Sequence, residues 1–190
     1  MMKIVYLLFA LLFSGLISAQ RPCAFSTTVK DSLGTYRSTS EYLVHEKNFG
    51  GNSSYLFFSL AETDGLPTLN TQLIQKSSGF IKAQCFDKNS RIYLQLNNGK
   101  IVTLMHIDVE NCGTSIRDQK GVNNRVMSGF FLFRKDSYEE LKKSPVSLIR
   151  IKYSTETIDY IIKDELKSEL DGKIYNPSGY FVETLHCLED

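Results

Sequence analysis

Short apolar runs, several of them alternating with polar residues, recur along most of the chain and predict β-strands. Most are bounded by Gly, Asn or Ser, which is typical of strands that end in tight turns. We expect strands at 41–46, 54–60, 69–76, 91–96, 101–106, 126–133, 146–153 and 157–162. Residues 80–86 form a further strand-like segment, and 20–40 is an irregular lead-in or edge strand. Residues 62–67 and 108–124 are polar, contain glycine and predict loops.

Three segments have the features of short helices. The first follows a capping box, which Asp136 or Ser137 can begin in two different frames, and it ends before Pro145. The second covers 163–170 and stops near Gly172. The third covers 179–188 and places its apolar residues on one side, namely Phe181, Leu185 and Leu188.

This order of elements predicts the fold class. Strands follow one another without the alternating strand–helix–strand pattern of a parallel sheet, and no repeat or interdomain linker interrupts them. We therefore expect a mainly β protein, an antiparallel β-sandwich or partly open barrel with two or three short helices. Residues 20–190 constitute one domain.

The first nineteen residues have the three parts of a secretory signal peptide. Lys3 precedes an uncharged apolar stretch, and small residues precede a cleavage site after Ala19, although Ile17 is larger than is usual three residues before the cut. A bilayer span needs about 20 apolar residues, so this stretch is short for one. The alternative is an uncleaved N-terminal anchor. Cleavage predicts an exported protein, periplasmic, cell-surface or secreted, without stable insertion in the membrane.

The charge of the exported part disfavours some partners. The whole chain has 22 basic and 21 acidic residues, and removal of 1–19 takes away one cation, leaving a formal net charge of zero. Proteins that bind nucleic acids usually carry a concentrated basic surface. No run of more than two basic residues occurs, so we expect no binding to nucleic acid.

A β-hairpin is predicted most clearly around Asn98 and Gly99. Both residues tolerate the positive φ of a type I′ turn, which makes Asn-Gly the strongest short hairpin signal. If they are the two loop residues, facing residues have numbers that add to 197. Leu96 then faces Ile101, Leu94 faces Thr103 and Ile92 faces Met105.

Four cysteines lie in the exported part, and an even number in such a chain suggests disulfides. Continued outward, the hairpin register places Cys85 opposite Cys112, at a separation that a disulfide spans. Cys23 and Cys187 then form the second pair. The alternatives are buried free thiols or a metal site, but no Cys-x-x-Cys pair exists. His186 adjoins Cys187, and neighbouring side chains rarely converge on one ion.

Motifs of common active sites are incomplete in this chain. Residues 51–55 lack the last glycine of Gly-x-Ser-x-Gly, and His45-Glu46 has only the first half of a zinc-peptidase motif. No catalytic residue, metal ligand or cofactor is therefore assigned. Paired carboxylates leave no local spacing, and Asp64, Asp87 and Asp108 lie in turns that such residues usually stabilise.

Aromatic residues offer a last candidate site. The clusters are Tyr55, Phe57, Phe58 and Phe130, Phe131, Phe133. They would suit a stacking platform for sugars or peptides, but strands buried on both faces carry the same residues. Core packing is the interpretation we prefer.

The second half of the chain resembles small exported bacterial β-rich domains of unassigned function. The resemblance covers about 54–188 and depends on six features in order: the Asn98-Gly99-Lys100 hairpin, the loop at Cys112, the apolar run 130–133, the helix at 137–143, the strand at 147–151 and the terminal 185–188. It implies export and a β-rich fold, and it carries no catalytic residues.

Our leading hypothesis is an exported non-enzymatic domain that binds a protein or a glycan in the cell envelope. It follows from a β fold with two predicted disulfides, a formal net charge of zero and incomplete catalytic motifs. The alternatives are a hydrolase that acts on envelope or extracellular polymers through loop carboxylates, and a purely structural envelope component. Two carboxylates about 5–9 Å apart in a groove would favour the hydrolase, and exposed aromatic residues would favour binding.

The cysteine pairing is open to a direct test. Peptide mapping without reduction should recover a peptide from around Cys85 joined to one from around Cys112. A peptide that joins Cys85 to Cys23 or Cys187 would refute the register, and four free thiols in protein from its native compartment would refute oxidative export.

Overall fold

The computed structural model describes residues 22–32, 34–107 and 109–189. It confirms the mainly β, antiparallel fold that the sequence predicts: of these described residues, 54% lie in strands and 9% in helices, and they form no closed barrel. The predicted signal peptide, 1–19, lies outside the described residues.

Eleven strands form one large antiparallel sheet. Its strands are β1 (Phe25–Asp31), β2 (Gly34–Thr39), β3 (Tyr42–Phe49), β4 (Asn52–Thr63), β5 (Leu66–Ser77), β6 (Arg91–Leu96), β7 (Ile101–His106), β8 (Thr114–Arg117), β9 (Asn123–Leu132), β10 (Val146–Lys152) and β11 (Thr157–Ile161).

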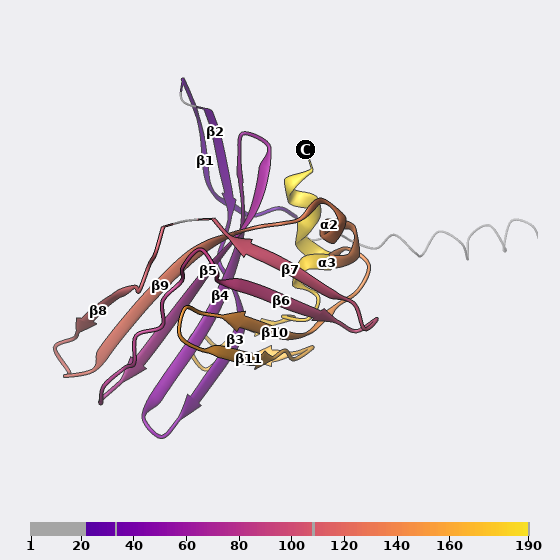
Figure 1. Ribbon diagram of the computed structural model, residues 1–190. Helices are drawn as coiled ribbons and strands as arrows, with labels where there is room; N and C mark the ends of the chain where they lie inside the picture. Colours follow the sequence, from indigo (N-terminus) through magenta and orange to yellow (C-terminus); the bar gives the residue numbers. More distant parts are fainter. Residues whose placement is uncertain (1–21, 33, 108, 190) are drawn as a thin grey trace, which may run out of the picture.

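The sheet is bent. Two of its long strands, β4 and β9, each pair with two different strands along the same edge. Its main order is β1-β2-β4-β5-β9-β7-β6-β10-β11, while β3 also pairs with β4 and β8 with β9. In Figure 1, β6, β7, β10 and β11 cross β3, β4 and β5, and the β1–β2 hairpin projects beyond them. The two parts of the sheet enclose one main core, which contains Leu56 and Phe58 from β4 together with Leu94 and Ile151 from β6 and β10.

Phe86 connects the two parts of the sheet at the centre of this core. It is fully buried, and its ring lies 5.2 Å from that of Phe131 on β9 and 5.2 Å from that of Tyr153, just after β10. The segment that carries it has no regular strand among 78–90, contrary to the strand expected at 80–86, and makes a single bridge from Phe86 to Asn111. Aromatic packing, rather than a ladder of backbone hydrogen bonds, therefore fixes this segment.

Two short helices close one end of the core. They are α2 (Lys135–Leu141) and α3 (Tyr180–Thr184), and a 3₁₀ turn, η1 (Leu185–Leu188), continues α3. The apolar side predicted for the last segment is buried as expected. The capping box is wrong in both frames, because α2 starts at Lys135 and Arg134 occupies the N-cap position without a side-chain cap.

The helix predicted at 163–170 is wrong. This segment contains β12 (Leu166–Lys167), which forms a two-stranded sheet with β13 (Ile174–Tyr175). Leu166 is buried in a small cluster with Leu43 and Tyr55, on the other side of β3 and β4 from the main core. Burial of this leucine outweighs the helix propensity of its neighbours.

The hairpin between β6 and β7 is confirmed, but its predicted register is wrong by one residue. Ile92 faces Leu104 and Leu94 faces Val102. The loop holds three residues rather than two, because the Leu96 N–H donates to Lys100 and the Gly99 N–H donates to Leu96. Gly99 has a φ of +82° and so provides the residue in left-handed conformation that such a three-residue loop requires.

Both segments predicted as loops contain regular structure. Asp64 and Gly65 have positive φ and form a two-residue turn, so β4 and β5 continue almost through 62–67. In 108–124, β8 pairs with β9 at residues 114–117. Residues 25–31 and 34–39, within the segment expected as an irregular lead-in or edge strand, form the β1–β2 hairpin, with β1 as the edge strand.

Gly129 should be sensitive to substitution because of Phe86. A Cβ atom at Gly129 would lie 2.7 Å from Phe86 Cδ2, whereas a Cβ atom at Gly79 would meet only Ser77 Oγ at 3.7 Å. We expect Gly129→Ala to lower the free energy of unfolding by about 1–3 kcal/mol. Gly79→Ala, the matched control, should change it by less than about 0.5 kcal/mol. Urea unfolding with the disulfides intact measures both free energies. Equal effects of the two substitutions would contradict the close packing of Phe86 against Gly129.

Candidate functional site

A groove of about 360 Å³ lies at the end of the sheet where β3, β4 and β5 meet the 78–90 segment. Sites for small ligands are typically about 300–1,000 Å³, so it is large enough for one. We call it the Phe49–Phe80 groove. Its lining residues are Lys47, Phe49, Asn52, Ser53, Ser54, Gln75, Lys76, Ser77, Phe80, Ile81, Lys82 and Gln84.

Two phenylalanines of this groove are unusually exposed. The exposed fraction is 79% for Phe49 and 90% for Phe80. Phe49 ends β3 just before the Gly50-Gly51 turn, and Phe80 follows the Ser77-Ser78-Gly79 turn. Each ring therefore offers an apolar face to a ligand.

The polar lining of the groove is basic and amide-rich. Lys47, Lys76 and Lys82 contribute three cations, and no carboxylate lines the groove among the described residues. One of these cations, Lys82, also contacts Glu156, with 3.3 Å between Nζ and Oε1. The Gln84 side-chain oxygen is buried without a hydrogen-bond partner among the described residues. The groove thus combines positive charge, amide groups and aromatic faces.

Sequence reasoning missed this groove. The aromatic residues considered from the sequence are mainly core, since Phe58 and Phe131 are fully buried and Tyr55 nearly so. Phe49 and Phe80 stand beside glycine turns, where polar residues are usual. A phenylalanine next to a glycine-containing turn was the sequence feature that could have indicated an exposed aromatic site.

The structure joins Cys23 to Cys187 and Cys85 to Cys112, the two pairs that the sequence favours. Their Cα atoms lie 5.5 Å and 4.0 Å apart. In the hairpin itself, the numbers of facing residues add to 196 instead of the predicted 197. Beyond the hairpin, Phe86 faces Asn111, so the predicted sum of 197 holds again and Cys85 meets Cys112. The Cys23–Cys187 disulfide fastens the start of β1 to η1.

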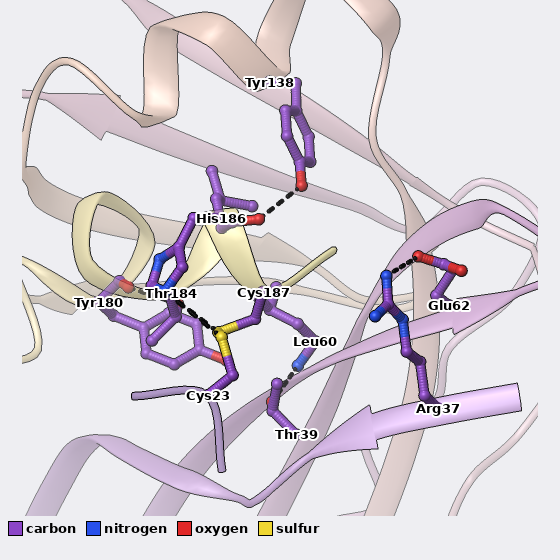
Figure 2. The surroundings of a disulfide bond; sticks show 11 residues. Cys23, Arg37, Thr39, Leu60, Glu62, Tyr138, Tyr180, Thr184, His186 and Cys187 are labelled. Carbon is purple, nitrogen blue, oxygen red and sulfur yellow. Dashed lines mark hydrogen bonds and ion pairs between the residues drawn. A yellow bond between two sulfur atoms is a disulfide. The ribbon is translucent and has the colours of Figure 1, made fainter. Parts of the chain in front are cut away.

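His186 lies against this terminal disulfide, as Figure 2 shows. Its Nε2 atom is 3.3 Å from Cys23 Sγ and 3.7 Å from Cys187 Sγ. The expectation that adjacent residues keep their side chains apart is wrong at this position. The 3₁₀ turn has a tighter geometry than an α-helix, and Cys23 approaches from another part of the chain.

Two groups of possible metal ligands are brought together by the disulfides. They are Cys23, His186 and Cys187, and Cys85, Glu110 and Cys112, each with ligand atoms within 4.8 Å of one another. In both groups the sulfurs are joined in a disulfide. A disulfide has no thiolate to offer, so neither group is a metal site in this state.

The carboxylates considered from the sequence support turns where the structure describes them. Asp64 Oδ1 accepts a hydrogen bond from the Thr35 N–H at 2.7 Å, which ties the β4–β5 turn to β2. Asp87 accepts hydrogen bonds from the Asn89 N–H and the Ser90 hydroxyl. Asp108 lies outside the described residues.

Glu139 and Glu189 line another surface groove of about 400 Å³, beside α2. Both contact Lys142 Nζ, which places them near each other. The hydrogen bond from Lys142 lowers the pKa of Glu139, whereas a general acid for glycoside hydrolysis needs a raised one. Glu139 is therefore unsuited to the role of general acid.

The seam between β3 and β11 holds His45. No ladder joins these two strands in the part of the chain that the structure describes, and the His45 ring packs edge-on against Tyr160 with 5.1 Å between centroids. Burial lowers the pKa of His45, and the cations Lys47 and Lys163 lower it further, while Glu46 opposes them.

Comparison of the chain with protein-family models, with curated proteins and with solved structures found no match. Within residues 22–32, 34–107 and 109–189, the longest helices are far too short to cross a bilayer.

The lowered pKa of His45 predicts a loss of stability in mild acid. Below pH 6.5 the unfolded chain takes up a proton at this residue that the folded protein resists, so stability present above that pH falls as the pH decreases. His45→Gln should flatten the decline in the free energy of unfolding between pH 7 and pH 5. Urea unfolding at a series of pH values measures this, and an unchanged slope would contradict the proposed role of the seam histidine.

Proposed function

We propose that the protein is an exported, non-enzymatic binding domain, and that the Phe49–Phe80 groove holds an acidic glycan of the cell envelope. The observation that carries the proposal is the pair of highly exposed phenylalanines in a groove lined by three lysines. Exposed aromatic residues were the feature expected of a binding domain rather than of a hydrolase.

Each part of the groove suits one part of such a ligand. Phenylalanine rings pack against the apolar faces of sugar rings, and the side-chain amides of Asn52 and Gln75 can hydrogen-bond sugar hydroxyls. Lysine ammonium groups attract carboxylates or phosphates on the glycan. Because no carboxylate lines the groove among the described residues, the electrostatic preference is for an anionic ligand.

The rigidity of the site also supports binding. Phe49 pairs with Asn52 at the β3–β4 turn, and β4 pairs with β5 along its whole length, including Asn52 with Ser77. The Asn123 side chain donates to the Gly79 carbonyl at 2.7 Å, which holds the turn before Phe80 against β9. A preformed groove avoids part of the entropic cost of ordering loops on binding.

Binding of acidic and neutral polysaccharides tests the proposal. Calorimetry with an oligomer of uronic acids should detect binding that weakens as salt rises, and a neutral glucan of the same length should bind more weakly. We expect Phe49→Ser or Phe80→Ser to reduce affinity about tenfold, which corresponds to about 1.4 kcal/mol.

Matched controls separate the groove from general surface effects. Ile161 is 74% exposed on β11, so Ile161→Ser removes a comparable apolar side chain elsewhere. Lys47→Gln and Lys76→Gln should lower the affinity and its salt dependence, whereas Lys30→Gln on β1 should not. Equal effects of groove and control variants would refute the site. Shortening of the oligomer during incubation would instead favour the hydrolase.

A further inference from the structure

The terminal disulfide is unequally accessible at its two ends. Cys187 has an exposed fraction of 3%, whereas Cys23 is partly exposed where the chain enters β1. Thiol–disulfide exchange begins with attack of a thiolate on one sulfur, and access decides which one. An incoming thiolate therefore reaches Cys23 Sγ, and the sulfur of Cys187 leaves.

His186 is positioned to assist this exchange. Its Nε2 atom contacts both sulfurs (Figure 2). The other ring nitrogen, Nδ1, is buried without a hydrogen-bond partner among the described residues. Within that part of the chain, the imidazole therefore makes its polar contacts with the two sulfur atoms. An imidazolium beside a cysteine sulfur stabilises the thiolate, and a stabilised thiolate leaves faster.

The second disulfide provides an internal contrast. Cys85 and Cys112 are both partly exposed, so access does not protect them. Their neighbour is Glu110, whose carboxylate lies within 4.8 Å of the sulfurs. A nearby negative charge disfavours a thiolate, which makes these sulfurs poorer leaving groups.

We propose that Cys23–Cys187 is an exchange-active disulfide, reduced by an external dithiol with His186 as the catalytic residue. One thiol of the dithiol passes its proton to His186 and bonds to Cys23 Sγ, the bond between Cys23 and Cys187 breaks, and Cys187 leaves as a thiolate that takes this proton from His186. The second thiol of the reductant then attacks the mixed disulfide, and its proton passes to Cys23 as that sulfur is released. The reductant leaves as its own disulfide, two electrons pass to the protein, and both cysteines end as thiols.

Opening this disulfide frees the N-terminal end of the sheet from the C-terminal turn. The start of β1 is then held by its own neighbours, through the hydrogen bond from the Ser40 N–H to the Ala24 carbonyl and the pairing of Phe25 with Thr39. All seven residues of β1 are exposed, and β2 is its only strand partner in the described sheet. The disulfide thus controls how firmly an edge strand is attached.

A time course of reduction tests the proposal in the oxidised full-length exported protein. The protein is treated with dithiothreitol, samples are alkylated, and mass spectrometry identifies which cysteines have opened. We expect Cys23 and Cys187 to become alkylated about tenfold faster than Cys85 and Cys112. Equal rates, or faster opening of Cys85–Cys112, would overturn the proposal, and this comparison needs no variant.

Two substitutions then assign the cause. His186→Gln should slow opening of Cys23–Cys187 about tenfold and leave the rate for Cys85–Cys112 unchanged. Glu110→Gln should speed only the opening of Cys85–Cys112. Circular dichroism of each oxidised variant shows that the fold is retained. If His186→Gln opens at the wild-type rate, exposure alone explains the reactivity and the role of His186 is refuted.

Discussion

The packing of Phe86 between the two parts of the bent sheet is the interaction on which the rest of the structure depends. Its ring contacts Phe131 on β9, which pairs with both β5 and β7, and Tyr153 just after β10, and the backbone of Gly129 leaves room for it. The segment that carries Phe86 has no ladder of its own. Since Cys85 precedes Phe86 and Phe80 lies six residues before it, this one buried ring also locates a disulfide and one wall of the groove.

Local signals in the sequence predicted most of the strands but not every connection. Alternation and apolar runs identified the strands from β3 to β11 except β8, because a half-buried pleated strand imposes that pattern. The β6–β7 register was wrong because Asn97-Asn98-Gly99 forms a three-residue loop, and the same dipeptide suits either loop length. The helix predicted at 163–170 was wrong because Leu166 packs with Leu43 and Tyr55, and helix propensity does not include such tertiary contacts.

The groove could not be predicted from the sequence, because its residues come from β3, β4, β5 and the following irregular segment. These four segments contribute between two and four residues each, and the pairing of β3 with β4 and of β4 with β5 brings the strand residues together. The same holds for His186 and Cys23, which lie 163 positions apart. The cysteine pairs were accessible to prediction because their number is small and a hairpin limits the choices.

The Cys23–Cys187 disulfide makes the folded chain almost a closed ring, because it links cysteines separated by 164 positions in the sequence. In such a ring, one cut at an exposed turn such as Gly50-Gly51 leaves every part covalently attached. A molecule exposed to proteases would therefore survive a single nick in one piece while the bond is closed. Opening the bond turns the same nick into two separable fragments, so the redox state of the surroundings would set how long a damaged molecule persists.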